Sequence, residues 1–130
     1  MVVLDSDILV DFLRGNSESK AKMEKLEDDG EKLNTTVINE FELIEGAYIK
    51  KDEKKFAVVE NLLRSFEIYE LNSVASWKAA EISAALRKSG EKVNFEDIAI
   101  ASIAICNGEV LVTRNVKHFR RIKELKIDKW

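Results

Sequence analysis

The feature that most constrains the fold is the alternation of short apolar runs with segments of helical periodicity. The apolar runs predict four strands and a candidate fifth, over Val2–Leu4, Leu33–Ile38, Ile68–Leu71, Val110–Thr113 and Leu125–Ile127. The segments between them predict helices over Ile8–Leu13, Ser17–Asp29, Asn39–Tyr48, Phe56–Leu63, Ser73–Leu86, Asn94–Cys106 and Val116–Ile122. Such alternation is typical of an α/β fold, with a central parallel sheet of four to five strands and helices on both faces.

The composition of the chain is that of a globular protein without disulfide bonds. The chain has 130 residues, 45% hydrophobic and 35% charged, which predicts one globular domain over residues 1–130. Its single cysteine, Cys106, lies in the apolar run IAIASIAIC, so we expect it to be buried, in a reducing compartment. No segment is long enough to span a membrane, and we expect a soluble cytoplasmic protein. A net charge of −3 excludes a global basic field of the kind that marks many nucleic-acid binders.

Polar side chains follow two of the predicted strands. Asp5 and Asp7 come directly after the run VVL, and Thr113 and Asn115 stand at the end of the fourth strand. Ligands of parallel sheets bind outside the carboxyl ends of the strands, which is where these side chains would lie. A carboxylate at the rim of an apolar core costs free energy unless its charge is offset. The two aspartates are therefore either helix caps or ligands of a cation.

Two further acids occur near helix starts. Asp97 lies in the first turn of an almost wholly apolar helix, where it either complements the helix dipole or serves a site. In NEFELIEGA the apolar periodicity places Glu40 closer to the buried stripe than Glu42, and a solvated helix face explains both. If such acids converge, their repulsion requires a counter-ion, and oxygen ligands suit Mg²⁺ or Mn²⁺. One histidine and one cysteine exclude the usual zinc sites.

Four blocks of the sequence, in order, resemble the PIN-domain ribonucleases, specifically the VapC-type toxins of toxin–antitoxin pairs: VVLDSDILVDFLRG, TTVINEFELIEGA, EDIAIASIAICNG and VLVTRNVKHF. The resemblance implies a PIN-like three-layer sandwich and a ribonuclease that hydrolyses RNA endonucleolytically with Mg²⁺ or Mn²⁺. The family's three metal-binding catalytic acids match Asp5, Glu42 and Asp97, which selects Glu42 over Glu40. The resemblance also implies a homodimer and a cognate antitoxin.

The chain departs from the family pattern at two positions. Many members have Asp where this chain has Asn115, and position 7, often Asn in the family, is Asp7 here. We expect Asp7 to compensate as a metal ligand, with the amide oxygen of Asn115 as a further ligand. The hydroxyls of Ser6 and Thr113 are candidates to orient the carboxylates, with a turn or cap role as the alternative.

A nuclease also needs cations for the phosphate backbone. Residues 113–126 contain six Lys or Arg against one acid, beginning next to the predicted site. We expect Arg114, Lys117 and Arg120 to bind RNA, although a solvated face explains such a run equally well. His118 is expected to be structural rather than a general base.

Two other functions fit parts of the pattern. An aspartate-nucleophile phosphohydrolase of haloacid dehalogenase type would use Asp5 as nucleophile and Asp7 as acid/base. A catalytically inactive PIN scaffold that only binds RNA would fit the missing acid at Asn115. A receiver domain is disfavoured because EIYELNS, at the third strand, has no acceptor Asp.

Overall fold

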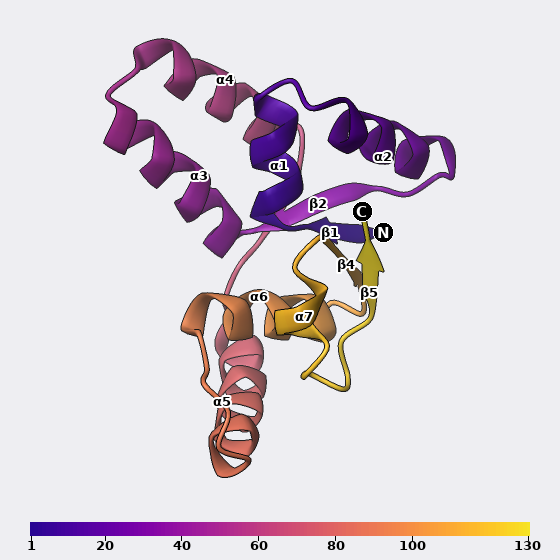
Figure 1. Cartoon of the computed structure of the whole chain (residues 1–130), viewed down its shortest axis with the longest axis vertical. Coiled ribbons are helices and arrows are strands. Elements are labelled where there is room, and N and C mark those ends of the chain that lie inside the picture. The colour runs from indigo at the N-terminus through magenta and orange to yellow at the C-terminus, as the bar shows by residue number, and fades with distance from the viewer.

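The computed structural model describes residues 1–130 and has five strands and seven helices (Figure 1). In chain order the elements are β1 (Val2–Leu4), α1 (Ser6–Leu13), α2 (Ser17–Asp28), β2 (Leu33–Thr36), α3 (Val37–Lys50), α4 (Glu53–Arg64), β3 (Glu67–Tyr69), α5 (Ser73–Lys88), α6 (Phe95–Cys106), β4 (Val110–Thr113), α7 (Val116–Phe119) and β5 (Ile127–Lys129).

All five strands are parallel and pair in the order β3-β2-β1-β4-β5. Helices α1 to α4 lie on one side of this sheet and α5 to α7 on the other (Figure 1). The predicted α/β sandwich with a central parallel sheet is therefore confirmed. The chain runs outward from β1 through β2 to β3, then returns to add β4 on the opposite side of β1. The carboxyl ends of β1 and β4 consequently border the crevice in which such sheets bind ligands.

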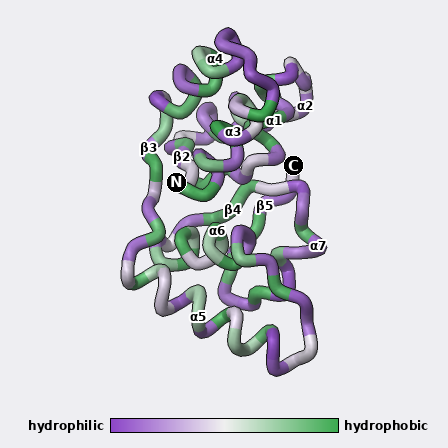
Figure 2. Tube along the Cα trace, turned by 90° about the vertical axis from the view of Figure 1, so that its left-hand side faces the viewer, coloured by the Kyte–Doolittle hydropathy of each residue, from purple (hydrophilic) through white to green (hydrophobic).

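The core has two apolar clusters, one on each face of the sheet. Alternate residues of a strand point to opposite faces, so Val3 and Leu111 pack toward α5 and α6, while Leu4 and Val112 pack toward α1 and α3. Figure 2 shows hydrophobic stretches through the middle of the molecule, around β4 and α6, and a mostly hydrophilic α2. Every residue of Ile98–Ala104 in α6 is buried, as its apolar sequence predicts. None of the helices combines the length and apolar content needed to cross a membrane.

The boundaries of β2, β3, β5 and α7 differ from those predicted by the sequence. Strand β2 ends at Thr36 instead of Ile38, because the Thr36 hydroxyl accepts hydrogen bonds from the first backbone N–H groups of α3. Strand β5 begins at Ile127, since Leu125 is buried in the cluster beneath α6. Strand β3 begins one residue earlier than predicted and ends at Tyr69, and α7 ends at Phe119.

The expectation that Cys106 is buried is wrong. Its side chain is exposed, at the last residue of α6. The helix is buried only as far as Ala104, and Gly108, with a φ of +66°, then turns the chain back toward β4. Apolar neighbours in sequence therefore misplace a residue that lies past the covered part of its helix.

A buried polar cluster joins β2, β3 and the start of β4. The Tyr69 hydroxyl donates a hydrogen bond of 2.6 Å to the carboxylate of Glu109, which is 5% exposed. The amide nitrogen of Asn34 lies 3.3 Å from the same hydroxyl and 3.5 Å from the Glu109 oxygens. Burial, together with the hydrogen bond to Glu109 and its charge, raises the pKa of Tyr69 further above neutral pH.

Replacing Tyr69 by Phe removes the shortest donor to a buried carboxylate. We expect the free energy of unfolding to fall by about 1–3 kcal/mol, measured by urea denaturation. Tyr48→Phe is the matched control, since the Tyr48 side chain is 66% exposed and should tolerate the change. Equal stabilities of the two variants would contradict this role of the cluster.

Candidate metal-binding active site

Asp5 is the centre of the candidate site. It follows β1 at the crevice between β1 and β4 and is 7% exposed. One carboxylate oxygen accepts hydrogen bonds from the Ser6 backbone N–H at 2.8 Å and the Asn39 amide at 3.1 Å. The other accepts from the Thr113 hydroxyl at 2.7 Å. All three donors are neutral, so no side-chain cation offsets the charge of this buried group.

The electrostatics of Asp5 follow from this environment. Burial is the main cause that raises the pKa of Asp5 to about 7, and repulsion by Asp7 adds to it. The hydrogen bonds from Thr113 and Ser6 act in the opposite direction without cancelling the shift. A carboxylate with this pKa gains free energy from any cation that reaches it.

Glu42 is linked to Asp5 through a chain of hydrogen bonds. Its carboxylate accepts from the Ser6 hydroxyl at 3.0 Å, and that hydroxyl accepts from the Asn39 amide at 2.8 Å. The Thr36 hydroxyl donates a hydrogen bond of 2.7 Å to the side-chain oxygen of Asn39, which orients the Asn39 amide nitrogen toward Asp5. Burial is the main cause that raises the pKa of Glu42. Glu40 instead lines a different pocket, with Ile44 and Tyr48.

Asp97 reaches the same region from the other helical layer. It lies in the first turn of α6, where its backbone N–H donates to the capping Asn94 side chain at 3.1 Å. Burial raises the pKa of Asp97, while His118, whose Nδ1 is 3.5 Å from the Asp97 carboxylate, lowers it. Repulsion by Asp97 in turn raises the pKa of Glu42, so the two carboxylates share one electrostatic environment.

Asp5, Glu42 and Asp97 lie farther apart than expected for three ligands of one metal ion. No three carboxylate, imidazole or thiol groups of the chain lie close enough to bind one metal ion together. Asp5 and Glu42 are joined through the Ser6 hydroxyl, and Asp97 acts on Glu42 through its charge alone. An ion in this site would therefore need water molecules to complete its coordination.

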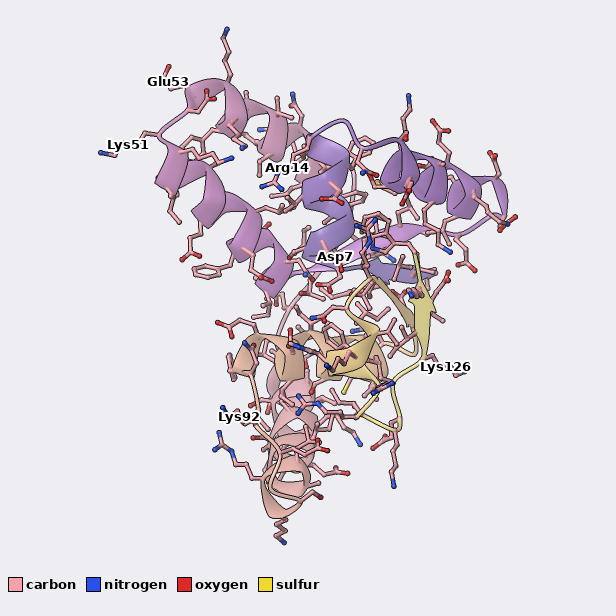
Figure 3. All side chains as sticks on the ribbon, in the orientation of Figure 1. Asp7, Arg14, Lys51, Glu53, Lys92 and Lys126 are labelled. Carbon is pink, nitrogen blue, oxygen red and sulfur yellow. The ribbon has the colours of Figure 1, made fainter.

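Asp7 binds the C-terminal part of the chain. One of its oxygens accepts from the Thr113 hydroxyl at 3.0 Å and the Arg114 backbone N–H at 2.8 Å. The other accepts from the indole N–H of Trp130 at 3.0 Å. Figure 3 shows Asp7 at the start of α1, between the two helical layers. Asp7 thus connects α1 to β4 and to the end of β5, whatever its part in metal binding.

Thr113 does more than end a strand. Its hydroxyl lies within hydrogen-bonding distance of both Asp5 and Asp7 and accepts the Asn115 backbone N–H at 3.0 Å. A hydroxyl has one proton, so it donates to only one of the two carboxylates at a time. Ser6 likewise joins Asp5 to Glu42. Both hydroxyls therefore contact the carboxylates that the sequence assigned to them.

The remaining predicted residues lie around this centre. Asn115 is half-buried at the start of α7, and its side chain does not cap that helix. The guanidinium of Arg114 contacts other residues of the chain. Its central carbon lies 3.8 Å from the centre of a Trp130 ring, and its nitrogens pair with Asp11 at 3.5 Å and Glu18 at 3.4 Å. Two further cations, Lys117 and Arg120, are exposed.

Two residues of the site were missed by sequence reasoning. Asn39 is fully buried and holds both Asp5 and Ser6, and its position three residues after the capping Thr36 was the available signal. Trp130 binds Asp7 across 123 positions of sequence, and no local pattern marks that contact.

Comparisons with known proteins show the family to which the chain belongs. The sequence model of the PIN domain matches residues 2–125. Ribonuclease VapC2 of Rickettsia felis is 31% identical over 103 residues, covering 76% of this chain and 77% of that protein. Ribonuclease VapC10 of Mycobacterium tuberculosis is 30% identical over 126 residues, covering 97% of this chain and 91% of that protein.

A solved structure extends the likeness to three dimensions. The crystal structure of VapBC2 from Rickettsia felis, bound to a DNA fragment from their promoter, superposes with a TM-score of 0.91 at 26% identity. The superposition covers 100% of this chain and 99% of that chain. Sequence and structure thus agree over nearly the whole length, and the chain belongs to the PIN domain family, among its VapC-type members.

Proposed function

We propose that this protein is a divalent-metal-dependent endoribonuclease and the toxin of a toxin–antitoxin pair. The observation that carries the proposal is the buried Asp5 carboxylate, which has only neutral donors and a pKa raised to about 7. The relatives of the chain are named VapC ribonucleases, and its structural neighbours include VapBC complexes. An enzyme of this kind would act in the cytoplasm, on cellular RNA.

The residues present fit a hard cation. The donors that face the site are oxygens of Asp5, Glu42 and Asp97, and they carry an excess of negative charge. Mg²⁺ keeps several waters and needs only one or two carboxylates, which suits acids that are linked through hydroxyls rather than in direct contact. A bound Mg²⁺ or Mn²⁺ would lower the pKa of a water and neutralise charge on the phosphate. Asp7 and Asn115 remain proposed further ligands.

The chain's own residues prepare the site. Ser6, Asn39 and Thr113 hold the carboxylates of Asp5 and Glu42 in fixed orientations, which avoids reorganisation when substrate binds. The proposed contacts to RNA phosphates are Arg114, Lys117 and Arg120. Arg114 would have to leave Asp11 and Glu18, or bind phosphate with a part of its guanidinium that these acids leave free.

The rival functions are less well supported. A haloacid dehalogenase mechanism needs a free acid/base two residues after the nucleophile, but both Asp7 oxygens accept hydrogen bonds from the chain. The hypothesis of an inactive scaffold depends only on the replacement of an acid by Asn115, and an assay of RNA cleavage tests it. Partner proposals follow the neighbours: VapBC complexes favour a cognate antitoxin, and the family resemblance favours a homodimer.

Asp5→Asn keeps the shape of the side chain and removes its charge. We expect it to slow cleavage of labelled RNA in Mn²⁺ by on the order of 100-fold or more, because the cation loses its most buried ligand. Asp28→Asn, at an exposed position of α2, is the charge-matched control and should retain activity. Cleavage that survives Asp5→Asn at the wild-type rate would reject this site.

The raised pKa of Asp5 also predicts a pH dependence of stability without metal. Asp5 binds a proton more tightly in the folded protein than in the unfolded chain, so its contribution to stability is lost as pH rises from about 4 through 7. At pH 8 Asp5→Asn should be more stable than the wild type by about 4 kcal/mol, with little difference at pH 4. Urea unfolding in EDTA measures both. A variant less stable at pH 8 than at pH 4, relative to wild type, would contradict the assignment.

Asp7→Asn tests whether the extra acid serves the cation. Removing its charge should weaken Mn²⁺ binding about tenfold in calorimetry. Trp130→Phe removes the indole donor to Asp7 and leaves the charge in place, so it separates loss of charge from loss of docking. Unchanged Mn²⁺ affinity in Asp7→Asn would show that Asp7 only binds the C-terminal segment.

A further inference from the structure

A second charged pocket lies beside the candidate active site, between α1, α3 and α4. Three basic side chains line it, from Arg14 at the end of α1, Lys50 at the end of α3 and Lys55 in the first turns of α4. Glu42 lines the same pocket and is its only acid. Glu42 also accepts a hydrogen bond from the Ser6 hydroxyl, and the Ser6 backbone N–H donates to Asp5, so Ser6 links the edge of this pocket to Asp5.

These three cations have no acidic partner. None of Arg14, Lys50 and Lys55 forms an ion pair anywhere in the chain. The nearby Asp52 accepts the backbone N–H groups of Lys54 at 3.0 Å and Lys55 at 3.4 Å as the cap of α4. The pocket therefore carries a surplus of positive charge.

The cations also repel one another. The neighbouring Lys50 is the main cause that lowers the pKa of Lys55; desolvation and the charge of Arg14 act in the same direction, and the charge of Asp52 opposes them. Figure 3 shows Arg14 directed into the space between α1 and the α3–α4 pair, whereas Lys51 and Glu53 point outward at the tip of that pair. Three like charges gathered in this way indicate a site for an anion that would relieve the repulsion.

We propose that Arg14, Lys50 and Lys55 bind a phosphate of the single-stranded RNA backbone, next to the position of cleavage. The proposal rests on the proposed ribonuclease function and extends its substrate contacts beyond the C-terminal basic run. A phosphodiester backbone that passes Glu42 would enter this pocket directly, since Glu42 borders both sites. Arg14 is free to bind phosphate with two parallel N–H groups, in contrast to Arg114, which pairs with two acids. The pocket is also lined by apolar side chains, among them Leu13 and Val59, which suit the ribose and base of the bound nucleotide.

The test measures RNA binding as a function of salt. The triple variant Arg14→Gln, Lys50→Gln and Lys55→Gln is made in the full chain with Asp5→Asn, so that the RNA remains intact. Its control carries Lys51→Gln, Lys88→Gln and Lys92→Gln, which removes the same charge from exposed positions outside the pocket. Binding of a labelled single-stranded RNA of about twelve nucleotides is followed by anisotropy in Mg²⁺ over a KCl series.

We expect the pocket variant to bind at least about tenfold more weakly than the control, with the slope of log K against log salt reduced by about 2. In the chain with Asp5 intact, the same variant should raise KM for RNA more than it lowers kcat. Circular dichroism of all variants checks that each one is folded.

Three results would overturn the proposal, and they are distinguishable from one another. If the wild type neither cleaves nor binds RNA, the ribonuclease function itself fails. If the wild type cleaves RNA but the pocket variant keeps its affinity and salt slope, the phosphate site alone fails. If, in that second case, the pocket variant also loses binding of an oligoglutamate peptide that the wild type binds, the pocket serves an acidic protein segment instead.

Discussion

The structure depends on the burial of one carboxylate at the carboxyl end of its first strand. Asp5 is nearly inaccessible, yet its three hydrogen-bond donors are all neutral. Such a group costs free energy in the ionised form, and the raised pKa expresses that cost. A fold that retains an uncompensated acid at this place is organised to receive a cation there.

The topology explains why the acid lies where it does. Strand β1 is at the centre of the sheet, with β2 and β3 added on one side of it and β4 and β5 on the other. The order of strands therefore reverses at β1, and the crevice beside Asp5, between β1 and β4, is open to both helical layers. Glu42 enters it from α3 on one face and Asp97 from α6 on the other. The acids therefore surround the site without being in contact, and hydroxyl and amide groups supply the connections between them.

Sequence was sufficient for the architecture and for part of the site. Periodicity predicted the seven helices and four strands, with errors at boundaries such as Thr36, which ends β2 and caps α3. The candidate fifth strand, Leu125–Ile127, shares only Ile127 with β5. Asp5 could be predicted because it directly follows a buried strand. The selection of Glu42 over Glu40 needed the family resemblance, since apolar periodicity favoured the other residue.

What could not be predicted depends on long-range contacts. The docking of Trp130 onto Asp7 joins the two ends of the chain, and the pairing of Arg114 with Asp11 and Glu18 depends on how α1 and β4 pack. The exposure of Cys106 likewise depends on where α6 passes out of the core. Each of these is decided by tertiary packing, on which local sequence carries no signal.

The most direct test of this account is an NMR titration of the Asp5 side-chain carboxyl, with and without Mg²⁺. We expect a pKa of about 7 without metal, against an ordinary value of 3.8, and a fall to that value or lower when Mg²⁺ is bound. A carboxyl that titrates near 3.8 without metal, or whose pKa does not change with Mg²⁺, would contradict the claim that a cation compensates this charge.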